Sequence, residues 1–147
     1  MRLSLCNEVL APWSWRRQCD VAAELGYEGL ELAPYTVETE TPHRLSSRRV
    51  RALRKTASDA GVAVSGLHWL LLAPKGLSIT AADKAQRART LEVMHGLVEL
   101  CAELGGEVLV HGSPAQRRLP KGKGEAAARR RAAAPRPRSR HIESAGR

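Results

Sequence analysis

Five polar residues that can bind oxygen atoms or move protons lie at or near the ends of short apolar segments of the sequence. They are Asn7, Glu8, Glu31, His68 and His111. An imidazole that titrates near neutral pH can donate to a substrate oxygen, bind a metal or transfer a proton, and a carboxylate can orient it. Either histidine alone would be explained by a hydrogen bond to a neighbouring carbonyl. Four successive apolar segments that end in this way instead favour a shared site.

A repeated joint in the sequence predicts how these residues are brought together. Residues 23–30 and 102–109 both begin Ala-Glu-Leu-Gly and continue into an apolar segment, and residues 59–62 are a looser third copy. Such helix-turn-strand joints are typical of α/β proteins with parallel strands. The predicted order is strand, helix, strand, helix, strand, helix, strand. Parallel strands all have their carboxyl ends at the same end of the sheet, so the five polar residues are expected to lie together at that end.

Capping residues and apolar spacing predict the three helices. The predicted N-caps are Ser14, Ser46 or Ser47, and the pair Thr80 and Asp83. The third helix is the longest, and its predicted apolar stripe consists of Leu91, Met94, Leu97, Val98, Cys101 and Leu104.

The charge of the chain is concentrated in its C-terminal residues. The net charge is +9, but residues 121–147 hold nine of the 24 basic residues and two of the 15 acidic ones, which leaves +2 for residues 1–120. Duplex binding usually needs a basic face on the folded domain, so the near-neutral body argues against nucleic acid as the partner. Residues 1–120 are predicted to be the folded unit. Residues 121–147, rich in alanine, arginine and proline, are predicted to be a disordered tail.

The cysteines and the hydropathy predict a cytoplasmic protein without membrane segments. Cys6, Cys19 and Cys101 are odd in number and lack the close spacing of a zinc knuckle or redox motif, so we expect reduced, buried thiols. No secretory signal and no apolar run of membrane-spanning length is found.

Four segments resemble sugar phosphate isomerases and epimerases of the xylose isomerase-like TIM barrel superfamily, which also includes apurinic endonucleases of the endonuclease IV type. The segments are residues 3–8, 26–34, 66–69 and 109–114. The resemblance covers about four-fifths of the chain and the first half of a barrel of about 250 residues. It implies a partial (β/α) TIM barrel of about four parallel strands with flanking helices.

The resemblance also implies a reaction and a set of residues. Family members move a proton next to a carbonyl of a small sugar or sugar phosphate, assisted by a divalent metal (Mn, Mg, Co or Zn). On this basis the candidate catalytic residues are Glu31, His68 and His111, and the candidate substrate-binding residues are Asn7, Glu8 and Trp69. Trp69 would form an apolar wall over a sugar ring, although tryptophan in a small core is the alternative.

The same resemblance leaves two alternative functions open. In the endonuclease branch His68 and His111 would be zinc ligands for DNA repair. In a non-enzymatic alternative, the chain is a fragment that pairs with another polypeptide or with itself through its open sheet edges.

The matching segments correspond to half a barrel, so we expect a truncated form with little activity. The metal carboxylates of the family come from later strands, so no residue is assigned as a metal ligand and tight metal binding is not expected. The composition beyond residue 120 further predicts a frameshift between about residues 118 and 124.

Overall fold

The computed structural model describes residues 3–118 and contains one four-stranded parallel sheet. The strands are β1 (Ser4–Cys6), β2 (Gly29–Leu32), β3 (Ala63–His68) and β4 (Val108–Val110), and their order in the sheet follows their order in the chain. This arrangement is the predicted partial (β/α) barrel, in which each strand is hydrogen-bonded to the next and a helical crossover connects the two. The predictions for the tail and the frameshift concern residues that lie almost wholly outside the described ones.

Three α-helices connect the strands. They are α1 (Trp15–Glu24), α2 (Ser47–Asp59) and α3 (Lys84–Leu104). Ser14 and Ser46 accept a backbone N–H at the first turns of α1 and α2, and Asp83 does so for α3. Thr80 was predicted to share the third cap, but its hydroxyl instead donates to the carbonyl of Arg118. Among the described residues no helix is both long and apolar enough to cross a membrane.

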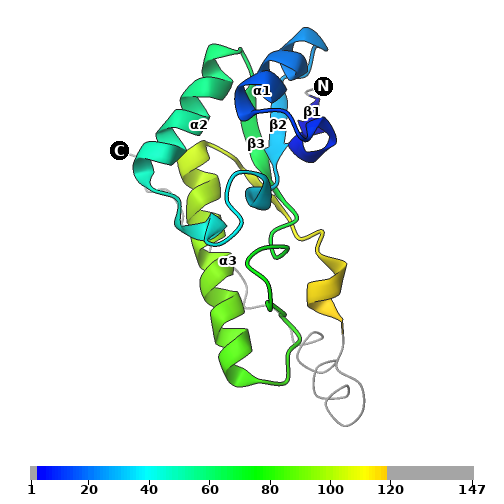
Figure 1. Ribbon diagram of the computed structural model, residues 1–147, viewed down its shortest axis with the longest axis vertical. Coiled ribbons are helices and arrows are strands. Elements are labelled where there is room, and N and C mark those ends of the chain that lie inside the picture. The colour runs from blue at the N-terminus through cyan, green and yellow to red at the C-terminus, as the bar shows by residue number, and fades with distance from the viewer. Residues whose placement is uncertain (1–2, 119–147) are drawn as a thin grey trace, which may run out of the picture.

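All three helices cover the same face of the sheet, where they form the core. Leu30, Leu32, Val64 and Leu67 from the strands lie in one buried cluster with side chains of α1, α2 and α3. Helix α2 contacts both α1 and α3; in Figure 1 α1 and α2 lie in the upper half of the view, with α1 beside β1, and α3 extends below α2.

The buried stripe of α3 differs from the predicted one. Leu97, Cys101 and Leu104 are buried as expected, but Leu91 and Val98 are more than half exposed. The helix contacts η3 (Pro42–Arg44) in addition to α2 and the sheet, and this packing selects a stripe that includes Val93 instead. Propensity and spacing alone do not determine which side of a long helix meets its neighbours.

A register shift between β2 and β3 decides which residues face away from the core. Leu30 pairs with Val64, but the next residue, Glu31, pairs with Gly66, so that Ser65 is an extra residue in β3. Because side chains alternate between faces, one extra residue exchanges the faces of everything that follows. His68 therefore lies on the same face as Glu31, opposite to the helices.

The sheet also requires a glycine at position 66. A Cβ atom added to Gly66 would lie 2.3 Å from the carbonyl oxygen of Val108 in the neighbouring strand. We expect Gly66→Ala to lower the free energy of unfolding by about 1–3 kcal/mol, because backbone atoms must move apart to accept the methyl group. Urea denaturation followed by circular dichroism measures this loss.

Gly112 offers the matched control for this substitution. Its φ is not positive, and an added Cβ would have its nearest neighbour at 4.0 Å, the backbone nitrogen of Trp69. Gly112→Ala is therefore expected to leave stability unchanged or slightly raised. Equal stability of the two variants would show that the close approach at Gly66 has no energetic consequence.

Candidate functional site

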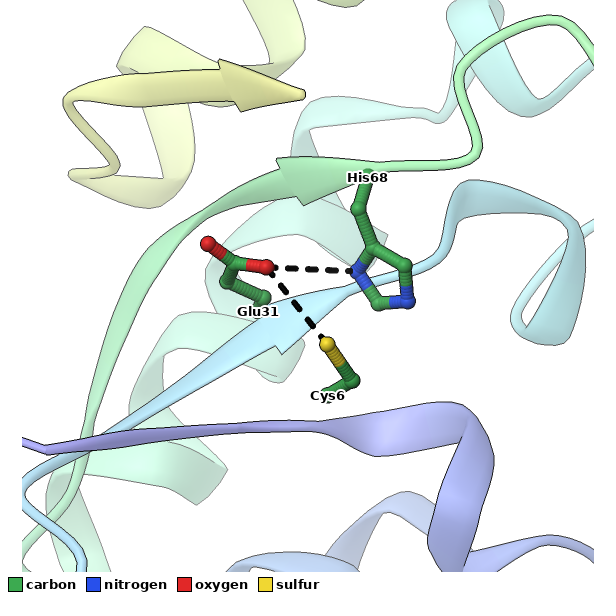
Figure 2. A group of neighbouring side chains, drawn as sticks. All are labelled: Cys6, Glu31 and His68. Carbon is green, nitrogen blue, oxygen red and sulfur yellow. Dashed lines mark hydrogen bonds and ion pairs between the residues drawn. The ribbon is translucent and has the colours of Figure 1, made fainter. Parts of the chain in front are cut away.

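Three side chains from three neighbouring strands meet on the sheet face that the helices leave uncovered. Cys6 ends β1, Glu31 lies in β2, and His68 ends β3 (Figure 2). The Cys6 thiol donates to Oε2 of Glu31 at 3.5 Å, and Nδ1 of His68 lies 4.0 Å from the same oxygen. Their potential ligand atoms all lie within 4.8 Å of one another. The sequence predicted Glu31 and His68 for the site, and the structure places them together.

The imidazole of His68 is buried without a hydrogen bond from any described residue. Its side chain is 5% exposed, and both ring nitrogens lack a partner at hydrogen-bond distance. Burial lowers the pKa of His68, while the carboxylates of Glu8 and Glu31 act in the opposite direction. Nε2 lies 3.7 Å from Oε1 of Glu8, so a carboxylate stands on each side of the ring.

Glu8 is held by two donors. Nε1 of Trp69 donates to its Oε1 at 2.8 Å, and the hydroxyl of Tyr35 donates to its Oε2 at 2.9 Å. Burial raises the pKa of Tyr35, and the bond to Glu8 adds to this effect. The backbone of Trp69 has a φ of 53°, which is uncommon for a residue other than glycine. The structure thus uses the indole of Trp69 to fix Glu8 beside His68.

Asn7 lies directly before Glu8 but is a buried residue. It begins η1 (Asn7–Leu10) and is 1% exposed. Its amide donates to Gln18 and Thr36, and its carbonyl oxygen accepts from the backbone N–H of Ala33 at 2.7 Å. These bonds hold η1 against α1 and the end of β2. Both amide protons are therefore used inside the protein.

His111 follows β4 and does not join the described group of Cys6, Glu31 and His68. Both of its ring nitrogens are buried without a hydrogen bond from the described residues. Burial lowers the pKa of His111, and Arg117 lowers it further. The endonuclease alternative needs His68 and His111 as joint ligands, whereas the groups that lie near the ring nitrogens of His68 are the carboxylates of Glu8 and Glu31 and the thiol of Cys6.

Cys6 is the member of the site that the sequence did not predict. Cys19 and Cys101 are buried as expected, but Cys6 is only partly buried. Partial burial raises the pKa of the Cys6 thiol, and the Glu31 carboxylate raises it further. The signal in the sequence was its position at the end of an apolar segment, the same position that drew attention to the two histidines.

The group fits the divalent metal that the fold family implies. A thiol, a carboxylate and an imidazole are all common metal ligands, and the two unpartnered nitrogens of His68 leave a ligand atom available. Cys6, Glu31 and His68 would hold the ion.

Three solved structures that are similar to this chain in fold are named as sugar epimerases. D-psicose 3-epimerase in the presence of D-fructose superposes with a TM-score of 0.62 at 16% identity, over 87% of this chain and 44% of that chain. The apo form of 3-keto-D-glucoside 4-epimerase from E. coli superposes with a TM-score of 0.59 at 15% identity, over 90% of this chain and 50% of that chain. D-psicose 3-epimerase from Clostridium cellulolyticum H10 with D-tagatose superposes with a TM-score of 0.60 at 14% identity, over 87% of this chain and 44% of that chain. The chain thus spans half or less of the length of these structures.

The family comparison agrees with the fold. No curated protein matches the sequence significantly. The model of the xylose isomerase-like TIM barrel family matches residues 19–141, which is most of the chain. The four parallel strands, their helical crossovers and this match lead to one conclusion: the chain belongs to the xylose isomerase-like TIM barrel family.

Proposed function

We propose that this chain carries part of the active site of a sugar isomerase or epimerase that moves a proton next to a carbonyl. The observation that carries the proposal is the position of Glu31 beside the unpartnered imidazole of His68, at the carboxyl ends of the strands. Active sites of TIM barrel enzymes lie at this end of the sheet. The D-fructose and D-tagatose present in two of the matching structures support a small keto sugar, phosphorylated or not, as the substrate class.

Glu31 is the carboxylate best placed to accept the proton. Both oxygens of Glu8 already accept a hydrogen bond, whereas the contacts of Glu31 to Cys6 and His68 are both made by Oε2. Oε1 of Glu31 is therefore the oxygen available to take a proton from the carbon next to the carbonyl. The electron pair of that C–H bond forms the enediolate double bond, and the carbonyl oxygen takes the negative charge.

His68 is placed to stabilise that oxygen. Its lowered pKa keeps the imidazole neutral near pH 7, so that one ring nitrogen carries a hydrogen and can donate it as a hydrogen bond. A divalent cation bound to His68 would take over this role from the imidazole, because the cation would polarise the same oxygen. Glu8, oriented by Trp69 and Tyr35, would accept hydrogen bonds from sugar hydroxyls beside the ring of Trp69. His111, which directly follows the fourth strand, is a further proposed catalytic residue.

Deuterium exchange tests the proposal. The full chain is incubated with D-fructose and, separately, with a ketose phosphate in heavy water, with and without Mn²⁺ or Co²⁺. Incorporation of deuterium at the carbon next to the carbonyl, followed by NMR, is expected with at least one sugar. Absence of exchange above the buffer rate with every sugar and metal would overturn the proposal for this chain.

A second candidate function, association through the sheet edges, is supported by the exposure of β4. Val108, Leu109 and Val110 are 50%, 38% and 41% exposed, and β4 and β1 are the two edge strands. Edge strands with exposed apolar side chains are templates for pairing. Two copies related by a two-fold axis along the barrel would pair β4 of each with β1 of the other and close eight parallel strands.

We therefore expect the purified chain to be a dimer. Size-exclusion chromatography with light scattering measures its mass, and Leu109→Lys is expected to shift the population toward the monomer. A stable monomer of the unmodified chain at all concentrations would contradict this expectation.

The three free thiols favour a reducing compartment such as the cytoplasm.

A further inference from the structure

The cluster of Cys6, Glu31 and His68 has a chemistry that the sugar reaction does not use. The removal of a proton from the carbon next to a carbonyl needs a carboxylate and a hydrogen-bond donor, but it does not need a thiol. The thiol–carboxylate hydrogen bond at 3.5 Å explains why Cys6 and Glu31 are neighbours. It does not explain why an imidazole with two unpartnered nitrogens is buried beside them. A buried polar group without a partner is costly and calls for a ligand.

The separations in the cluster are close to those of a shared metal ion. Tetrahedral zinc with its usual bond lengths places a sulfur and an oxygen ligand about 3.6 Å apart, and a nitrogen and an oxygen ligand about 3.4 Å apart. The observed separations are 3.5 Å from Cys6 Sγ to Glu31 Oε2 and 4.0 Å from His68 Nδ1 to the same oxygen. The third pair, Cys6 Sγ and the ligand nitrogen of His68, lies within 4.8 Å, so the imidazole would have to move toward the other two ligands to complete the set.

The three strands hold the ligands in place. Cys6 pairs with Glu31 in the β1–β2 ladder, and Glu31 pairs with Gly66, two residues before His68 in β3. Each ligand therefore stands on a hydrogen-bonded strand rather than on a loop, and Figure 2 shows the three side chains directed toward one another. On its other side, Nε2 of His68 lies near Glu8, which is the carboxylate partner that metal-binding histidines usually have.

The donor set selects the metal. Thiolate sulfur favours Zn²⁺ and similar ions, whereas Mg²⁺ and Mn²⁺ favour sites made of oxygen ligands. Three protein ligands with further positions open is the composition of a catalytic zinc site. From these observations we propose that Cys6, Glu31 and His68 form a binding site for Zn²⁺ or Co²⁺, with at least one coordination position left for an oxygen ligand. Glu31 would bind through Oε2 and retain Oε1.

Cobalt titration of the full chain under reducing conditions tests the site. We expect one Co²⁺ per chain, with a sulfur-to-cobalt charge-transfer band in the near ultraviolet that one equivalent of Zn²⁺ removes. Loss of an outer-shell partner typically weakens metal binding about 10- to 100-fold, so loss of a direct ligand should cost at least about 100-fold. Cys6→Ala is expected to abolish the band, and Glu31→Gln to weaken binding by that factor.

Cys101→Ala is the matched control, because it removes a buried thiol on the opposite face of the sheet and should leave the band unchanged. Circular dichroism of each variant shows that the fold is retained. A band that persists in Cys6→Ala, or cobalt binding without any band, would overturn the proposal, as would failure to bind Co²⁺. The measurement involves no sugar and no turnover. Absence of deuterium exchange in a chain that binds Co²⁺ would therefore reject the sugar chemistry and leave the metal site standing.

Discussion

Replacing Glu31 by glutamine is expected to lower the rate of deuterium exchange about 100- to 10,000-fold, the usual contribution of a general base. The amide keeps the size and hydrogen-bonding capacity of the side chain but cannot accept the proton. The substrate still meets Glu8, His68 and Trp69, so the loss should lie in kcat rather than in KM. Exchange rates at saturating sugar and saturating metal separate this effect from weakened metal binding.

Glu28→Gln is the matched control for this experiment. Glu28 directly precedes the same strand at its opposite end, where it is exposed, and it is distant from the candidate site. Its substitution should leave the exchange rate unchanged. An equal loss in both variants, or a Glu31→Gln variant that retains full exchange, would show that Glu31 is not the base.

Replacing Asn7 by alanine is expected to lower the free energy of unfolding by about 3–5 kcal/mol, because the substitution leaves several polar groups without their hydrogen-bond partner at once. The backbone N–H of Ala33 loses its acceptor, and the side chains of Gln18 and Thr36 lose their donor. Each buried group left without a partner costs about 1–3 kcal/mol. Chemical denaturation measures the loss.

Asn7→Leu distinguishes hydrogen bonding from packing. Leucine fills the volume of asparagine but restores none of its bonds, so it should be as destabilising as alanine. If leucine recovers most of the stability, the site depends on packing. A loss below about 1 kcal/mol for Asn7→Ala, the value of a single ordinary hydrogen bond, would contradict the network altogether.

The predicted role of Asn7 illustrates the limit of reasoning from position alone. The sequence placed it at the end of the first strand and therefore among substrate-binding residues, and that role stays a prediction. The structure buries it at the start of η1 and directs both of its amide protons to other parts of the chain. These partners lie 11 and 29 residues away. Only the packing of α1 and η2 (Pro34–Thr36) against the strand brings them within reach.

By itself the sequence determined the order of strands and helices, their parallel pairing, and that polar residues lie at the carboxyl ends of the strands. These features follow from local patterns: apolar runs, capping side chains and glycines that end helices. The sequence also determined that Glu31 points away from Leu30 and Leu32, since alternation within one strand is a local property.

Only the tertiary structure decided which of these residues form one group. The extra residue Ser65 turns His68 onto the face of Glu31, and the β1–β2 ladder places Cys6 beside them. Alternation along a strand can be read from the chain, but the register between two strands depends on hydrogen bonds between residues far apart in sequence. A shift of one residue exchanges the two faces of the sheet, so the composition of the site was fixed by strand pairing and not by the pattern of any single segment.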